Sequence, residues 1–253
     1  MNAPLAIEFV NVQYRTAANR VLLSDLNLSV NRGEILVLLG PSGSGKTTTL
    51  KLVNRMLDPT AGQVRVDGRA TTDWDAISLR RRIGYAIQEG GLFPHYSVFE
   101  NVALVPRLEK WKTARANQRV EEVLNLVGLP TAEFAGRFPH ELSGGQRQRV
   151  GLARALAADP PFLLMDEPFG ALDPMTRAGL QREFKELQQS LQKTVIFVTH
   201  DVAEGLLLAD RIAVLDGGKL CGIYSRSEFL SSADAAVGPY LEAIKTIQAS
   251  LER

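Results

Sequence analysis

"EILVLLGPSGSGKTT", Glu34 to Thr48, is the stretch that decides the fold. After the glutamate, its first half is continuously apolar, as expected of a parallel strand that is covered on both faces. Its second half matches the pattern G-x-x-x-x-G-K-[ST], the P-loop, with Gly40 in the first position and Lys46 as the lysine. A strand, a glycine-rich loop, a lysine and a helix in this order predict a phosphate-binding loop at the end of a sheet strand.

The residues of the P-loop have separate expected roles. Glycines let the backbone curl, so that successive N–H groups point at the phosphates of a nucleotide. Lys46 adds a mobile positive charge, and the Thr47 hydroxyl can bind Mg²⁺. The residues expected to hold the phosphates are Gly40, Pro41, Ser42, Gly43, Ser44, Gly45, Lys46, Thr47 and Thr48.

A second apolar run, "FLLMDEP", carries Asp166 and Glu167 to the carboxyl end of a buried strand. Ligands of open α/β sheets bind at that edge. Asp166 is suited to hold Mg²⁺ through water, and Glu167 can orient and deprotonate the water that attacks the γ-phosphate. The alternative is that both acids only cap the next segment, but the P-loop in the same chain favours a catalytic function.

Three more residues are candidates for the same site. His200 ends the apolar run "TVIFVTH", so its imidazole should reach the same sheet edge, touch the γ-phosphate and keep the water and Glu167 in register. Gln88 ends "RIGYAIQ" and is either an exposed loop residue or a functional one. Tyr14 lies where an aromatic ring could stack on adenine, although a tyrosine that only packs in a strand fits as well.

Composition narrows the class of protein. The chain has 253 residues and a formal net charge of +1, without the basic excess that is typical of nucleic-acid-binding domains. Cys221 is the single cysteine, so no internal disulfide is possible and a reducing compartment fits. No apolar run approaches the roughly 18 residues that span a bilayer, and the first residues do not resemble a secretion signal. Any membrane contact is therefore expected to go through a partner.

Hydrophobic patterning predicts the arrangement of the elements. Residues 7–14 and 26–30 read as strands of a small antiparallel layer, and helical periodicity dominates residues 115–127 and 146–157. These patterns predict an α/β fold: a P-loop NTPase (RecA-like) core with an N-terminal antiparallel β layer and an inserted α-helical subdomain. We expect one domain in which residues 1–88 and 159–224 form the core, 89–158 the helical subdomain, and 225–253 a helical tail.

The stretch "HELSGGQRQRV", His140 to Val150, contains no obvious nucleophile, base or metal ligand. It places a serine and two glycines directly before a predicted helix. The N–H groups at a helix N-terminus attract anions, which makes this a second candidate phosphate site. Turn chemistry alone could also explain the glycines.

The motifs together resemble those of ATP-binding cassette (ABC) proteins. The P-loop, Gln88, "LSGGQ", "LLMDE", "ALD" at residues 171–173, and His200 occur in that family's order along nearly the whole chain. "LSGGQ" is the signature motif of the family. The resemblance implies ATP and Mg²⁺ as ligands, with Thr47, Gln88 and Asp166 at the metal.

The resemblance also explains the second phosphate site. Two cassettes pack head to tail, and each ATP lies between the P-loop of one chain and the signature motif of the other. It implies that Ser143, Gly144, Gly145 and Gln146 complete the nucleotide site of a second copy. Asp173 would help to couple the two sites, Gln88 would link Mg²⁺ and water to the helical subdomain, and Tyr14 matches the aromatic that stacks on adenine.

Several functional classes share this fold, and the sequence discriminates among them. "GRFPHELSGGQRQRV" and "DEPFGALDPMTR" are similar to bacterial importer ATPases, whereas the coiled-coil or zinc insertions of nucleic-acid ATPases are missing. We therefore expect an ATPase bound at the cytoplasmic face of the inner membrane to integral permease subunits, and through them to a substrate-binding protein. A soluble ABC ATPase linked to nucleic acid is the rival hypothesis.

The segment "QEGGLFPHYSVFENVALV", which begins at Gln88, carries three aromatic residues. In the resembled family this region forms the groove that receives a short helix of the membrane subunit, so Phe93 and Tyr96 are candidate contacts, and Phe99 is expected to pack in the core. "RIGYAIQEGGLFPH" and "NVALVPRL" resemble ATPases that import glycine betaine and other quaternary-ammonium osmoprotectants. An importer of another small solute, such as an amino acid, is the alternative.

Overall fold

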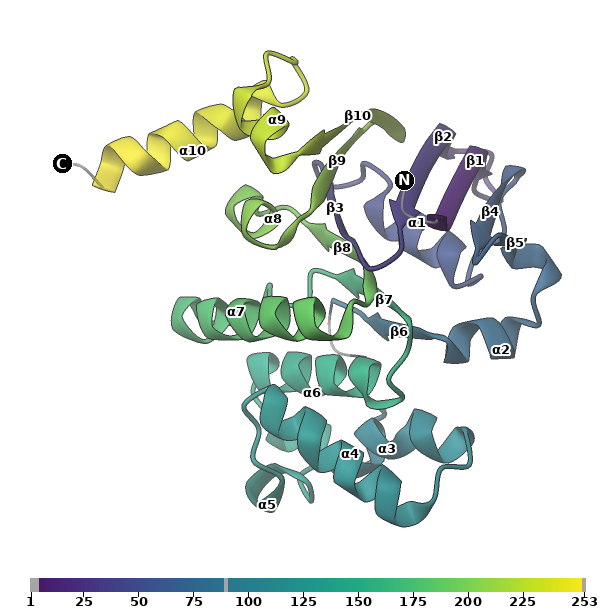
Figure 1. Cartoon of the computed structure of the whole chain (residues 1–253), viewed down its shortest axis with the longest axis vertical. Coiled ribbons are helices and arrows are strands. Elements are labelled where there is room, and N and C mark those ends of the chain that lie inside the picture. Colours follow the sequence, from purple (N-terminus) through teal and green to yellow (C-terminus); the bar gives the residue numbers. More distant parts are fainter. Residues whose placement is uncertain (1–4, 89–90, 252–253) are drawn as a thin grey trace. The chain divides into compact units, whose positions relative to one another are not determined.

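The structure is a computed structural model that describes residues 5–88 and 91–251 (Figure 1). The chain divides into two compact units. Unit 1 contains Met1–Ala76 and Thr194–Arg253, and unit 2 contains Ile77–Lys193. The prediction that residues 89–158 form an inserted subdomain stays a prediction.

Unit 1 begins with an antiparallel sheet in the order β2-β1-β4-β5. Its strands are β1 (Leu5–Arg15), β2 (Val21–Asn31), β4 (Ala61–Val66) and β5 (Arg69–Ala70). The predicted antiparallel layer is therefore present, but its third and fourth strands were missed. Alternating Val64 and Val66 followed by the pair Asp67-Gly68, both at positive φ, are a hairpin signal that could have found them.

The second set of strands in unit 1 is mainly parallel, in the order β10-β9-β3-β8. The strands are β3 (Ile35–Leu39), β8 (Thr194–Thr199), β9 (Arg211–Asp216) and β10 (Lys219–Ser225). β3 runs parallel to both β8 and β9, whereas β10 is antiparallel to β9. Every residue of β3 and β8 is buried, which explains why both strands read as unbroken apolar runs.

The helices of unit 1 cover and extend these strands. They are α1 (Lys46–Val53), α8 (Val202–Leu208), α9 (Arg226–Ser231) and α10 (Gly238–Leu251), with a 3₁₀ turn η1 (Thr71–Asp73). α8 packs on β3 and β8. The ring of the fully buried Phe229 of α9 packs against the rings of Tyr224 on β10 and Tyr240 on α10, so aromatic packing attaches the C-terminal helices to β10.

Unit 2 combines two parallel strands with a group of helices (Figure 1). The strands are β6 (Ile83–Ala86) and β7 (Phe162–Asp166). The helices are α3 (Val98–Leu108), α4 (Thr113–Leu126), α5 (Thr131–Phe134), α6 (Gly144–Ala157) and α7 (Pro174–Leu191), with η2 (Pro139–Glu141), and α2 (Ala76–Arg81) spans the boundary of the units. α6 contacts α3, α4 and β6, so one helix joins the helical group to the strands.

Candidate functional site

The P-loop connects β3 to α1 in unit 1. Gly45 has a φ of 103°, a left-handed conformation that a side chain disfavours. A Cβ at Gly45 would lie 2.6 Å from Cδ2 of Leu23, and a Cβ at Gly40 would lie 2.2 Å from the carbonyl oxygen of Leu215. Glycine is therefore required at both positions. Gly45 is required by its backbone conformation and by lack of space, and Gly40 by lack of space alone.

The side chains of the loop make a cradle for an anion. Nζ of Lys46 donates to the carbonyl oxygens of Gly40 and Pro41 at 2.7 and 2.9 Å, which holds the ammonium group over the loop. The Ser44 hydroxyl is buried and has no hydrogen-bond partner among the described residues. A buried polar atom without a partner is costly. A phosphate oxygen can accept a hydrogen bond from this hydroxyl, and a phosphate suits the N-terminus of α1, so the loop fits a nucleotide phosphate.

His200 and Tyr14 also belong to unit 1. Thr199, the last residue of β8, is paired with Leu39, the last residue of β3. His200 and Gly40 therefore follow directly from paired residues at the same edge of the sheet, as the sequence predicts, and His200 is exposed there. Tyr14 is half-buried on β1 and is paired with Leu23 of β2.

In unit 2, β7 ends at Asp166, and Glu167 follows it. Asp166 is only 6% exposed. Burial raises the pKa of Tyr85 on β6, and the negative charge of Asp166 raises it further. Glu167 has a φ of 48°, a left-handed conformation that costs a residue with a side chain about 1–2 kcal/mol. Backbone strain of this kind gathers at functional sites, where surrounding contacts must hold it.

Gln88 is placed against Glu167. Its Nε2 donates to Oε2 of Glu167 over 3.0 Å, although Gln88 itself is exposed. The two residues are 79 positions apart in the chain and follow the neighbouring parallel strands β6 and β7. The structure therefore brings together the glutamine and the carboxylate that the sequence singled out.

Gln148 is a site residue that the sequence analysis missed. It lies on α6, is 4% exposed, and its Nε2 donates to the carbonyl oxygens of Gln88 and Glu167 at 3.1 and 3.0 Å. Its Oε1 accepts the N–H of Ala171 at 2.9 Å. Helical spacing offered a signal, because Gln148 shares one face with the buried Leu152 and Ala155, where a polar residue needs partners.

The signature motif forms the start of α6. Ser143 is the N-cap: its hydroxyl accepts the N–H of Gln146 at 3.2 Å, while Oε1 of Gln146 accepts the N–H of Ser143 at 2.8 Å. Among the described residues, and apart from the backbone of α6 itself, the atom nearest to a Cβ placed at Gly144 is the end of Arg147, at 3.9 Å. The capping box fixes the helix start, and the space beside Gly144 leaves room for an anion.

Asp173 is the N-cap of α7. Its carboxylate accepts the N–H of Thr176 at 3.0 Å, and this bond holds the pKa of Asp173 below its usual range. Asp173 is exposed, so its carboxylate remains available to another molecule.

The predicted site residues thus divide between the units. The P-loop, Tyr14 and His200 belong to unit 1. Gln88, the signature motif, Asp166, Glu167 and Asp173 belong to unit 2. Within the described residues, no three His, Cys, Asp or Glu side chains gather to hold a metal ion. The predicted magnesium ligands Thr47, Gln88 and Asp166 come from both units and stay a prediction.

The family model described as ABC transporter matches residues 23–170. This chain belongs to the ABC transporter family. The choline transport ATP-binding protein OpuBA of Bacillus subtilis is 47% identical to this ABC chain over 247 residues, which cover 97% of the chain and 64% of OpuBA. The osmoprotectant import ATP-binding protein OsmV of Salmonella typhimurium is 49% identical over 227 residues, 89% of the chain and 59% of OsmV. The chain spans about three fifths of the length of these relatives.

A solved structure supports the same assignment. The ATP-binding cassette MJ0796, described as a dimeric post-hydrolysis state bound to ADP and Pi, is 35% identical to the ABC chain. The two structures superpose with a TM-score of 0.80 over 87% of this chain and 98% of that one. The predicted fold class is confirmed.

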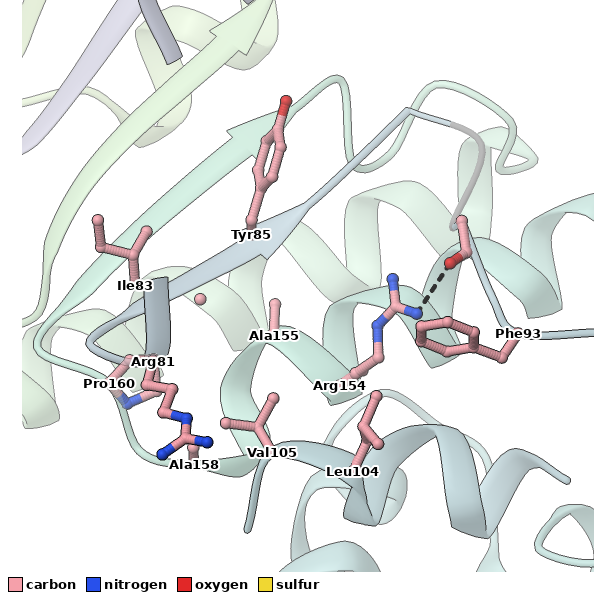
Figure 2. Close-up of a pocket in the computed structure, with 12 residues that line it drawn as sticks. Arg81, Ile83, Tyr85, Phe93, Leu104, Val105, Arg154, Ala155, Ala158 and Pro160 are labelled. Carbon is pink, nitrogen blue, oxygen red and sulfur yellow. Dashed lines mark hydrogen bonds between the residues drawn. The ribbon is translucent and has the colours of Figure 1, made fainter. Parts of the chain in front are cut away.

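The ABC chain also carries a cavity of about 280 Å³ in unit 2 (Figure 2). β6, α3 and α6 line it, together with Phe93. Arg154 donates to the carbonyl oxygen of Gly91 at 2.8 Å and lies 6.0 Å from the centre of the Phe93 ring. Burial lowers the pKa of Arg154. Arg81 also lines the cavity. Apolar walls and two arginines therefore make a groove that suits a helix with an apolar face and a hydrogen-bond acceptor.

Phe93 and Tyr96 near this groove are exposed, whereas Phe99, expected in the core, is only half-buried; the contact of Phe93 and Tyr96 with a membrane subunit stays a prediction. Phe93 and Tyr96 are 48% and 41% exposed, and their ring centres lie 5.5 Å apart. Phe99 is half-buried beside Arg107 of α3. Glu89 and Gly90, in the same predicted segment, lie outside the described residues.

In the described part of the chain, no helix has both the length and the apolar character to cross a membrane.

Proposed function

We propose that this chain is the ATP-binding and ATP-hydrolysing subunit of a bacterial ABC importer. The observation that carries the proposal is the contact of 3.0 Å between Gln88 and the carboxylate of Glu167, at the end of a buried strand. The P-loop cradle in the same chain supplies the phosphate site. The names of OpuBA and OsmV, both ATP-binding proteins of transport systems, support it independently.

The nucleotide phosphates would bind to the N–H groups of the P-loop, from Gly40 to Thr48, and to Lys46. Lys46 would exchange its carbonyl partners for phosphate oxygens, a charge-assisted bond that is stronger than a bond to a neutral acceptor. The buried Ser44 hydroxyl would gain its missing partner. Bound Mg²⁺ would neutralise phosphate charge, and its proposed ligands are Thr47, Gln88 and Asp166.

In hydrolysis, Glu167 would accept the proton of the attacking water. The amide of Gln88 fixes one carboxylate oxygen of Glu167, and this bond would orient the carboxylate for the water. The exposed His200, at the end of β8, would contact the γ-phosphate. Tyr14 would stack on the adenine ring.

A second copy of the chain is the proposed partner in ATP binding. Ser143, Gly144, Gly145 and Gln146 would complete the nucleotide site of that copy, because a capped helix N-terminus is suited to a phosphate. Head-to-tail packing makes both sites equivalent about a twofold axis. Asp173 would couple the two sites. The dimeric form of the related cassette MJ0796 supports this arrangement.

The membrane partner would be a pair of integral permease subunits. The groove beside Phe93 would receive a helix of the permease, and the chain would sit at the cytoplasmic face of the inner membrane. Through the permease it would serve a substrate-binding protein. No nucleic-acid partner is proposed, because the net charge of +1 offers no attraction for phosphate backbones.

An osmoprotectant such as glycine betaine or another quaternary amine is the proposed solute, and the names of OpuBA and OsmV support it. The test is uptake of labelled glycine betaine and choline into vesicles that contain the chain with the permease and binding protein encoded beside it. ATP-dependent uptake is expected. Uptake of an amino acid, without uptake of glycine betaine or choline, would overturn the proposed solute but not the ATPase assignment.

The ATPase assignment has its own test. Hydrolysis of ATP by the purified chain is measured with Mg²⁺, with and without the permease, DNA or RNA. We expect hydrolysis that depends on Mg²⁺ and does not respond to nucleic acid. Stimulation by DNA or RNA would favour the rival class instead.

A further inference from the structure

We propose that Gln148 is a positioning residue for ATP hydrolysis, which ties the signature helix α6 to Gln88 and Glu167. This inference rests on the proposed ATPase function. Gln148 lies two residues beyond "LSGGQ", and the sequence alone assigned it no role. Its importance comes from the three hydrogen bonds of its side chain.

Both the nitrogen and the oxygen of the Gln148 side-chain amide form hydrogen bonds. Its two N–H groups face two carbonyl oxygens, at 3.1 Å from Gln88 and 3.0 Å from Glu167. Its oxygen accepts from the N–H of Ala171. The opposite orientation of the amide would set oxygen against two carbonyl oxygens, so the network determines the orientation. The side chain therefore joins the segments after β6 and β7 and the loop before α7.

The bond to Glu167 falls where the backbone is strained. The Glu167 carbonyl oxygen accepts from Nε2 of Gln148 and from the N–H of Gly170, at 3.0 and 3.2 Å. These two donors hold a residue whose φ is 48°. The rotation of this residue about its backbone sets where its carboxylate points, so loss of one donor should let the proposed base drift.

The side chain of Gln148 also holds Gln88, the hydrogen-bond partner of the proposed base. Gln148 fixes the carbonyl of Gln88, while the Gln88 side chain fixes the carboxylate of Glu167. Both members of the pair are therefore restrained by one residue of α6. Because Gln148 lies two positions after Gln146, a rigid helix connects this restraint to the signature motif. A shift of the signature motif would move the base.

A purely structural role makes a different prediction, because any buried glutamine that loses its bonds lowers stability. Gln188 on α7 provides a matched control. It is 6% exposed, and its Nε2 donates to the carbonyl of Lys193 at 2.9 Å, where the chain leaves α7. Gln148→Met and Gln188→Met both keep the size of the side chain and remove the amide.

The experiment measures kcat and KM for ATP with the full chain, and Tm for each variant. For Gln148→Met we expect kcat to fall between about tenfold and a hundredfold, as for a misplaced catalytic group, with KM within about twofold of the wild type. For Gln188→Met we expect kcat within about twofold. A normal kcat in Gln148→Met would overturn the proposal.

A double-mutant cycle with Glu167→Gln separates positioning from stability, using single-turnover hydrolysis of labelled ATP. If Gln148 acts through Glu167, Gln148→Met should lower the residual rate of Glu167→Gln by less than about twofold. The same loss in both backgrounds would overturn the proposal.

Gln148→Glu is the second variant. It keeps the size of the side chain and the oxygen that accepts the Ala171 N–H, but it replaces the amide nitrogen with an oxygen that faces the carbonyl oxygens of Gln88 and Glu167. We expect its kcat to fall at least as far. If neither Gln148 variant folds while Gln188→Met does, Gln148 serves stability and the proposal is overturned. A wild-type chain that never hydrolyses ATP, even with its permease, would overturn the proposed function too; normal Gln148 variants of an active chain would overturn only this inference.

Discussion

Nε2 of Gln88 donates a hydrogen bond to Oε2 of Glu167 over 3.0 Å. The bond joins the segment that follows β6 to the residue that follows β7. A carboxylate held by an amide keeps its orientation without losing its charge, which is what a general base in hydrolysis requires. This contact makes Glu167 the first residue to test.

Glu167→Gln should retain ATP binding while hydrolysis falls by roughly a hundredfold or more, because an amide cannot accept the proton of the attacking water. Nucleotide affinity and steady-state turnover are measured on the same preparation. Asp216→Asn, at the exposed end of β9 in unit 1, is the matched carboxylate control. Turnover close to that of the wild type would reject Glu167 as the base.

Lys46→Ala should lose most of its affinity for ATP, because the cation that faces the P-loop is removed. Lys46 is 7% exposed, and its Nζ is held by two carbonyl oxygens of the loop. Lys51→Ala, on the same helix α1, is the control and should bind ATP normally. An equilibrium titration with a fluorescent ATP analogue makes the comparison. Equal affinity in the two variants would count against the cradle.

Gly40→Ala should destabilise the chain by about 2 kcal/mol, as is typical when a methyl group is forced into a packed site. The added Cβ would lie 2.2 Å from the carbonyl oxygen of Leu215. Apart from the backbone of α7 itself, the described residues place no atom within 4 Å of a Cβ at Gly179. Gly179→Ala should therefore be neutral or stabilising by about 0.5–1 kcal/mol, because alanine favours a helix. Urea unfolding followed by circular dichroism gives both values. A stable Gly40→Ala variant would mean that the loop can move away from Leu215.

The lowered pKa of Asp173 predicts that the free energy of unfolding depends on pH. The Thr176 N–H lowers the pKa of Asp173 in the folded chain, so the bond stabilises the fold fully above the unfolded pKa of about 3.9. That contribution is lost as the pH falls through the folded pKa. The Tm of Asp173→Ala should therefore lie below that of the wild type at pH 7, and the difference should shrink below about pH 4.

Asp173→Asn is the control for this pH dependence, because asparagine also caps helices but carries no titrating group. The difference in Tm between Asp173→Asn and Asp173→Ala should therefore stay the same when the pH is lowered to 3. Melting curves from pH 7 to pH 3, without nucleotide, test both expectations. A constant difference between the wild type and Asp173→Ala over this range would contradict the assigned cause.

Phe93→Ser should weaken attachment to the permease, because it removes an exposed aromatic ring from the rim of the groove. Leu230→Ser is the control: both side chains are 48% exposed, and Leu230 lies on α9 in unit 1. Co-purification with a tagged permease in detergent measures the retained fraction. We expect Phe93→Ser to be retained several-fold less than Leu230→Ser, and equal retention would move the contact elsewhere.

The parts of the fold that the sequence predicted are those in which a local pattern carries the information. β3 and β8 are buried on both faces, so each reads as an unbroken apolar run. The P-loop needs glycine at fixed positions because the backbone itself curls there. β4 and β5 were missed since they are short and more exposed, and their apolar alternation covers only two residues.

The contact between Gln88 and Glu167 was harder to predict from the sequence. The sequence named both residues, but their contact depends on the parallel pairing of β6 and β7. Gln148 was not singled out, although it lies two residues after the signature motif, because its three hydrogen-bond partners lie 19 to 60 positions away in the sequence.

By itself, the sequence determined which chemical groups this ABC chain possesses: a glycine-rich loop with its lysine, two acids at the end of an apolar strand, and a serine and two glycines before a helix. These follow from the order of residues, since backbone conformation and strand burial are local properties. Only the tertiary structure decided that a glutamine of α6 holds both Gln88 and Glu167, because a hydrogen bond depends on distances of about 3 Å between segments that only folding brings together.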